Sequence, residues 1–179
     1  RDWPLATLRS QVCIVAQDTF LFSDTIGGNI GFGAGECRDE RYIRRMAQIA
    51  GADNFIKSMP QGYDTVVGER GVGLSGGQKQ KVACSSVCTA GPNVLVFDEP
   101  SSNLDARAIG ELAKAIGLLK AQGKTIVIAE HRLYWLAGLV DRVYYMHEGR
   151  IEREMNAEQF RSLPDAERLE MGLRPVSVE

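Results

Sequence analysis

The sequence predicts an α/β fold whose core is a parallel β-sheet covered by helices on both faces. Short apolar segments at 94–98 and 125–130 are separated by a longer segment of helical character. Strands that alternate with helices in this way are typical of parallel sheets. The chain has 179 residues, which is enough for one domain with a sizeable core.

The first half of the chain is expected to begin with a strand and to continue mainly as helices. Residues 11–16 are apolar enough for a short buried strand that ends at Gln17, and the next loop holds an exposed-looking Phe20-Leu21-Phe22. Apolar residues then recur at helical spacing. The further elements expected here are a helical stretch from 25 to about 59, a turn at 60–64 and a Gly-rich loop at 68–73.

The second half alternates more regularly. A helix is expected from about Ser75 to Ala90, where Gly91-Pro92 ends it. The elements expected after it are a strand at 94–98, a helix at 105–122, a strand at 125–130, a short helix near 133–137, strands at 142–146 and 150–153, and a helical tail at 157–169.

Three parts of residues 1–179 are expected on this basis. They are a helical subdomain of residues 25–90, an α/β core of residues 1–24 and 91–155, and a C-terminal helical tail of residues 156–179.

Composition narrows the function classes. The net charge is -2 with both signs interspersed, whereas nucleic-acid binding needs clustered Lys and Arg, so no nucleic-acid partner is expected. No apolar run approaches the roughly 20 residues that span a bilayer, and no signal peptide is evident. The abrupt start without Met suggests a piece of a longer protein.

The cysteines form no C-x-x-C pair. They are Cys13, Cys37, Cys84 and Cys88. Small buried side chains in a reducing compartment are the favoured interpretation. The alternative is a metal or redox pair at Cys84 and Cys88, which lie four residues apart on one helix face.

The segment Leu74-Ser75-Gly76-Gly77-Gln78 has the local chemistry of an anion-binding helix start. Ser75 is a favourable N-cap and Gln78 completes a capping box. The two glycines let backbone N–H groups approach an anion at a helix N-terminus, which favours negative charge. A plain capped helix start is the alternative.

Three further blocks follow this segment. The apolar residues 94–97 begin 16 residues after Gln78 and lead into Asp98-Glu99-Pro100. Ser101-Ser102-Asn103-Leu104-Asp105 comes next, and His131 closes a later apolar strand. Asp105 is also expected to N-cap the helix that follows. The carboxyl ends of such strands are where α/β sheets bind ligands. A strand that ends in a solvated acidic turn is the alternative for the carboxylate pair.

In this order and spacing the four blocks resemble the ATP-binding domain of ABC transporters. The resemblance implies a P-loop NTPase-type parallel-sheet core, here incomplete, with a helical signature subdomain. Gln17, which lies 57 residues before Leu74, matches the family's Q-loop glutamine. The same gap leaves no room for the long coiled coil of chromosome-structural ATPases.

The resemblance also implies roles for individual residues. Asp98 and Gln17 would hold Mg²⁺, and Glu99 would act as general base, with His131 and Gln17 also at the catalytic centre. Residues implied to contact nucleotide are Leu74, Ser75, Gly76, Gly77, Gln78, Ser102 and Asp105.

ATP and Mg²⁺ are the implied cofactors. The implied partners are a second ABC ATP-binding domain, in a homo- or heterodimer, and transmembrane transporter subunits, which place the chain at the cytoplasmic face of a membrane. The first part, including Phe20–Ile26, resembles exporters. The second part, including Ile128–Leu133, resembles the ATPases of energy-coupling-factor vitamin importers.

One departure from the family pattern is large. The sequence contains no G-x-x-x-x-G-K-[ST] and therefore no phosphate-cradling loop with its lysine. We expect the chain alone to be inactive and to leave a hydrophobic sheet edge exposed. The favoured function is an ATP-hydrolysing transporter subunit. The alternative is a non-enzymatic interaction module that offers its signature face to an intact partner.

Overall fold

The computed structural model describes residues 3–34, 39–102 and 104–173. It divides into two compact units, Arg1–Ala129 and Glu130–Glu179, and each is described by itself. Within the described residues, no helix is both long and apolar enough to cross a membrane. The predicted three-part subdivision of the chain stays a prediction.

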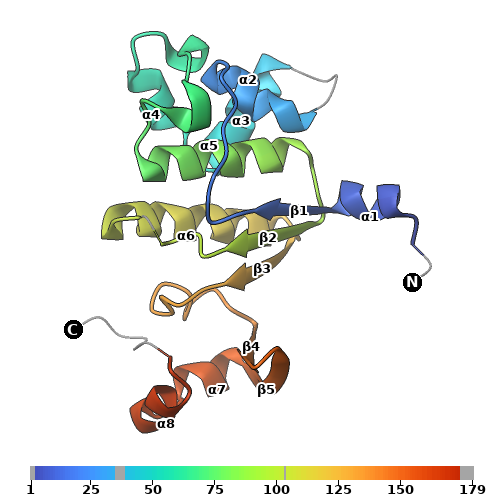
Figure 1. The fold of residues 1–179 in the computed structure, drawn as a ribbon, viewed down its shortest axis with the longest axis vertical. Coiled ribbons are helices and arrows are strands. Elements are labelled where there is room, and N and C mark those ends of the chain that lie inside the picture. Colours follow the sequence, from blue (N-terminus) through green and yellow to red (C-terminus); the bar gives the residue numbers. More distant parts are fainter. Residues whose placement is uncertain (1–2, 35–38, 103, 174–179) are drawn as a thin grey trace. The chain divides into compact units, whose positions relative to one another are not determined.

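The first unit is built on a three-stranded sheet in the order β1-β2-β3 (Figure 1). The strands are β1 (Val12–Val15), β2 (Val94–Asp98) and β3 (Thr125–Ala129). Both pairs are parallel, and Val15, Phe97 and Ile128 lie in one cross-strand row. The predicted parallel sheet is therefore confirmed, and the carboxyl ends of all three strands meet at one edge.

Two helices cover one face of this sheet. They are α5 (Gly76–Thr89) and α6 (Ala106–Ala121). Cys84 and Cys88 of α5 and Leu119 of α6 share a hydrophobic cluster with Val15, Leu95 and Phe97. Leu95 and Phe97 are only 1% and 0% exposed, so this face carries the core of the unit.

The opposite face of the sheet is open within the described part of this unit. Ile14, Val96 and Val127 form its central cross-strand row. Ile14 is 63% exposed and Val127 is 50% exposed. The prediction that helices cover both faces is therefore wrong for these residues, because α5 and α6 both pack on the other side.

The mainly helical residues 21–82 share a second hydrophobic core. The region expected to be helical from 25 to about 59 contains three separate α-helices in its described residues. They are α2 (Ile26–Gly31), α3 (Glu40–Ile49) and α4 (Asp53–Ser58). A single 3-10 turn lies within this region at Phe32–Ala34, and two more follow it at Gly62–Asp64 and Glu69–Gly71. Leu21 is buried in this core at 2% exposure, so the expectation of an exposed 20–22 segment holds for its two phenylalanines only. A short helix that was not predicted, α1 (Leu5–Gln11), precedes β1.

The second unit consists of a hairpin and two short helices. Strands β4 (Arg142–His147) and β5 (Arg150–Asn156) are antiparallel. Glu148 and Gly149 join them with φ of 46° and 74°, the left-handed pair that two-residue hairpin turns favour. Helices α7 (Ala157–Arg161) and α8 (Asp165–Glu170) follow.

Two predictions for the second unit need correction. The short helix expected near 133–137 is a series of turns, in which the Leu136 N–H donates to the Leu133 carbonyl oxygen at 3.1 Å. The tail is two helices rather than one, because Pro164 cannot continue a helix. The Arg168 guanidinium then donates to the carbonyl oxygens of Phe160 and Arg161 at the end of α7.

Candidate nucleotide-binding site

The parallel register brings the two predicted catalytic residues of the first unit together. Val15 pairs with Phe97, so Gln17 and Glu99 each come two residues after a paired position. The Gln17 Nε2 amide donates to the Glu99 Oε2 carboxylate oxygen at 3.1 Å. Residues 82 apart in sequence therefore meet at the carboxyl edge of the sheet, where the sequence predicts a site.

Glu99 has a backbone conformation that the sequence did not predict. Its φ is 42°, in the left-handed region. Holding a residue other than glycine there costs about 1–3 kcal/mol. The Glu99 N–H donates to the Ala129 carbonyl oxygen at 2.9 Å, and its own carbonyl oxygen accepts from the Ser102 N–H at 3.1 Å. These two hydrogen bonds hold the strained backbone in place and thereby fix the position from which the Glu99 side chain extends.

The residues after Glu99 lead into α6. Asp98 is exposed at the end of β2, and Ser102 is half-buried. Asp105 is the N-cap of α6, and its side chain accepts from the Ala108 N–H at 2.7 Å. The predicted capping role of Asp105 is confirmed. Asn103 lies outside the described residues.

The signature segment, Leu74 to Gln78, leads into α5 as the sequence indicated. The Ser75 hydroxyl accepts from the Gln78 N–H at 3.3 Å, and the Gln78 side chain accepts from the Ser75 N–H at 2.9 Å. The capping box is therefore confirmed. The Leu74 side chain is instead buried in the helical core, so only its backbone is available to a ligand. A Cβ on Gly77 would lie 3.4 Å from Leu104 and 3.5 Å from Ala108, which places that glycine against the start of α6.

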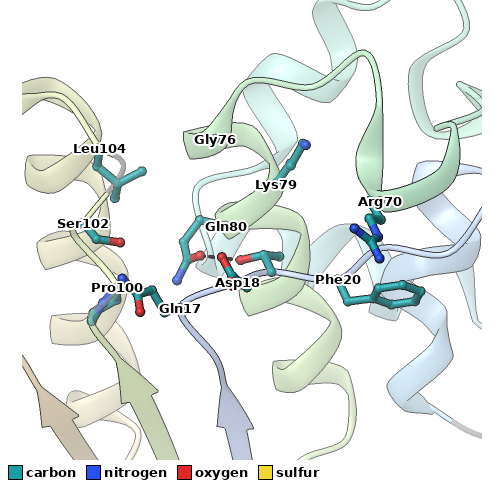
Figure 2. Close-up of a pocket in the computed structure, with 11 residues that line it drawn as sticks. Gln17, Asp18, Phe20, Arg70, Gly76, Lys79, Gln80, Pro100, Ser102 and Leu104 are labelled. Carbon is teal, nitrogen blue, oxygen red and sulfur yellow. Dashed lines mark hydrogen bonds between the residues drawn. The ribbon is translucent and has the colours of Figure 1, made fainter.

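A pocket of about 580 Å³ lies between these segments (Figure 2). It brings the predicted residues Gln17, Gly76 and Ser102 to one cavity. Arg70 and Phe20 lie at the opposite end of it from Ser102 and Leu104 (Figure 2). Its lining residues are Gln17, Asp18, Thr19, Phe20, Arg70, Gly76, Lys79, Gln80, Pro100, Ser102 and Leu104.

Sequence reasoning missed five polar residues of this pocket, namely Asp18, Thr19, Arg70, Lys79 and Gln80. The Thr19 hydroxyl donates to the Gln80 Oε1 atom at 2.6 Å. Arg70 has a φ of 57°, a second left-handed residue at the site. Lys79 and Gln80 follow the signature segment directly, and that position next to the anion-binding helix start was the one signal that could have identified them.

His131 belongs to the second unit. It is exposed and comes two residues after the end of β3. Its role in the catalytic centre stays a prediction.

The donor set at the sheet edge suits a magnesium ion that keeps most of its water. Asp98 and Glu99 offer adjacent carboxylates and Gln17 an amide beside them. Within the part of the chain that the structure describes, no group of three or more His, Cys, Asp or Glu side chains could hold a metal by itself. Mg²⁺ is usually bound through one or two carboxylates plus substrate phosphates and water, so these residues fit it as part of a nucleotide complex.

Comparison with known proteins identifies the family. The family model described as ABC transporter matches residues 2–102, more than half of the chain. The chain belongs to the ABC transporter family. The predicted resemblance and the predicted fold class are confirmed by this match.

The curated relatives include exporters. The chain is 37% identical over 159 residues to an ATP-dependent lipid A-core flippase of Photobacterium profundum, covering 88% of the chain and 27% of the relative. It is 38% identical over 164 residues to a putative multidrug export ATP-binding/permease protein of Staphylococcus aureus, covering 89% of the chain and 28% of the relative. The chain thus spans about a quarter of the length of these relatives.

A solved structure agrees with these relatives. The fold matches a bacterial Atm1-family ABC exporter with ATP bound, with a TM-score of 0.81 and 35% identity, covering 93% of this chain and 29% of that one. The exporter resemblance of the first part is therefore confirmed. The resemblance of the second part to energy-coupling-factor ATPases stays a prediction.

Proposed function

We propose that this ABC-family chain is the ATP-binding and hydrolysing component of an exporter. The hydrogen bond between Gln17 and Glu99 is the observation that carries the proposal. It joins a polar amide to a candidate general base at the ligand-binding edge of a parallel sheet. Gly76 at the capped N-terminus of α5 lines the same pocket as Gln17, which supports a phosphate-binding role for the helix start beside the proposed catalytic edge.

The catalytic roles follow from the chemistry of each side chain. Asp98 and Gln17 would hold Mg²⁺, which when bound neutralises charge on phosphate oxygens. Glu99 would accept a proton from the attacking water, and its fixed backbone supports that role because a general base needs a defined position. His131 would contact the terminal phosphate and orient the same water.

The signature segment is proposed to bind ATP that a second ABC ATP-binding domain holds. Residues 1–179 contain no G-x-x-x-x-G-K-[ST], and we propose that the phosphate loop comes from that partner. Backbone N–H groups at the start of α5 would then meet the terminal phosphate across the dimer interface. Leu74 would contribute through its backbone, Ser75 to Gln78 through the capped helix start, and Ser102 and Asp105 through the adjoining loop.

An exposed aromatic cluster supports a contact with transmembrane subunits or domains, at the cytoplasmic face of the membrane. The Phe20 and Phe22 rings meet edge to face with centroids 5.2 Å apart, and Phe32 lies 4.5 Å from Phe22. The three are 43–60% exposed, and exposed apolar patches mark interaction sites. Buried Asn29 fixes the loop, because its side chain accepts from the Phe22 N–H at 2.8 Å.

The test for the signature is association with an intact ABC ATP-binding subunit, followed by size-exclusion chromatography with and without Mg-ATP. The chain should form an ATP-dependent heterodimer. Gly77→Asp should abolish the ATP dependence because it adds a negative charge to the helix N-terminus that is proposed to bind the phosphate. Gly77→Ala is the matched control, since it adds only a methyl group at ordinary contact distance. Equal association by the Asp and Ala variants would contradict the proposal.

A second experiment separates the enzyme from the alternative, a non-enzymatic interaction module. After a phosphate-loop region is joined to the start of this chain, Glu99→Gln should lower hydrolysis by roughly 10²-fold or more, the scale of general-base assistance, while ATP binding and association persist. Unchanged hydrolysis with intact association would favour the interaction module, because the partner alone would then supply the catalytic base.

A further inference from the structure

Two hydrogen bonds fix the loop that carries Gln17. Gln17 donates to the Glu99 carboxylate at 3.1 Å. Two residues later, the Thr19 hydroxyl donates to Gln80 of α5 at 2.6 Å. Gln17 and Asp18 form a bend after β1, and the bonded Thr19 follows this bend directly. The anchor at Thr19 therefore limits where the Gln17 side chain can reach.

Gln80 is a buried amide of which only one end has a partner. It is 7% exposed, and its Oε1 atom accepts from Thr19. Its Nε2 atom has no hydrogen-bond partner among the described residues. Leaving a buried donor unsatisfied costs about 1–3 kcal/mol. Figure 2 shows this nitrogen turned toward the side of the pocket on which Gln17 and Pro100 lie, so the amide spans the distance from Thr19 to the cavity.

The helix that carries Gln80 is the one that the signature segment begins. The capping box fixes the start of α5, and Gln80 lies one turn after Gly76. The far end is tied down as well, since the Thr89 hydroxyl donates to the Ile30 carbonyl oxygen at 2.8 Å. Both ends of the helix that carries Gln80 are therefore anchored.

We propose that Gln80 is a positioning residue that, through Thr19, holds the Gln17 amide against the Glu99 carboxylate. The link joins the signature helix to the general base of the same chain. While the amide donates to Oε2, one acceptor atom of that base is occupied, so the position of α5 governs how much of the carboxylate is available to water. The catalytic role of this link rests on the proposed function, but the link from Gln80 through Thr19 to Gln17 does not.

The test reads the Gln17 side chain directly by NMR on the 179-residue chain. The Gln17 Nε2 protons should be shifted and protected from exchange with water in the unmodified protein. Gln80→Leu should remove the shift and speed this exchange about tenfold, as expected for loss of one hydrogen bond. Thr19→Val should do the same, whereas Thr19→Ser keeps the hydroxyl and should restore the original signals.

Thr89→Val is the matched control, because it removes a hydroxyl bond of the same helix at its other end. It should lower stability and leave the Gln17 signals unchanged. The double variant of Thr19 and Gln80 should match either single variant, since both break one link. Unchanged Gln17 signals in Gln80→Leu, with the rest of the spectrum native, would overturn the proposal.

The design keeps this proposal separate from the proposed function. If the heterodimer does not form with ATP but Gln80→Leu releases Gln17, the function is wrong and the link is correct. If the heterodimer forms but Gln80→Leu leaves Gln17 in place, the link is wrong and the function stands.

Discussion

The two faces of the sheet in the first unit have similar residues and opposite environments. Phe97 and Leu95 on one face are 0% and 1% exposed beneath α5 and α6. Ile14 and Val127 on the other face are 63% and 50% exposed. Both faces carry the apolar side chains of a strand buried on two sides. Apolar sequence therefore shows that a face can be covered, but it does not show what covers it.

The covered face also explains the position of the candidate site. Both covering helices begin close to the carboxyl edge of the strands, α5 at the signature segment and α6 just after Ser102. Packing against Phe97 therefore holds two helix N-termini near the pocket. The open face contributes side chains to no part of the pocket lining.

The largest expected effect comes from the covered face. Phe97→Ala should lower the free energy of unfolding by about 3–5 kcal/mol, because it leaves a cavity where the ring is fully enclosed. Urea denaturation followed by circular dichroism measures it. Val96→Ala, one residue away on the open face, is the control and should cost about 1 kcal/mol or less. Similar losses for both variants would show that the open face is covered in solution.

Local signals account for what the sequence predicted well. Ser75 with Gln78, and Asp105, are caps whose partners lie three residues away. The parallel sheet followed from apolar strands that alternate with helices. The contact between Gln17 and Glu99 was predicted only in part. The sequence predicted a site at the sheet edge, but the hydrogen bond depends on the register of β1 and β2.

The features that were missed depend on contacts distant in sequence or on context. Gln80 meets Thr19 across 61 residues, and nothing near either residue signals the pairing. The φ of Glu99 is imposed by bonds to Ala129 and Ser102 rather than by its residue type. Pro164, by contrast, is a local signal for the break between α7 and α8. The helical pattern on both sides of it led to the prediction of a single helix.

A smaller effect is expected from the ion pair that joins the two covering helices. Lys81 of α5 bonds Glu111 of α6, and this hydrogen bond lowers the pKa of Glu111 below its ordinary value of 4.5. Because the folded pKa is lowered, the pair stabilises the protein fully above pH 4.5 and is lost as the pH falls through the folded value. Both side chains are partly exposed, so the contribution is about 1 kcal/mol or less.

Glu111→Gln tests this pH dependence. The variant should be slightly less stable than the unmodified protein near neutral pH, and the difference should vanish as the pH falls well below 4.5. Unfolding by urea at a series of pH values measures it. Glu152→Gln, an exposed carboxylate on β5, is the control and should keep the pH profile. A difference that grows in acid would contradict the assignment.

The smallest effect on stability is expected on the open face of the sheet. This prediction tests most directly whether the two faces of the sheet differ in exposure. Ile14→Thr combined with Val127→Thr should change the free energy of unfolding by about 0.5 kcal/mol or less, because both side chains already meet solvent. The same substitutions should reduce self-association, since they break an exposed apolar row that other copies can cover. Light scattering against protein concentration measures this, with Leu118→Thr on the exposed side of α6 as the matched control. A large loss of stability without any change in association would mean that a segment of the same chain already covers Ile14 and Val127, and the contrast between the two faces would then disappear.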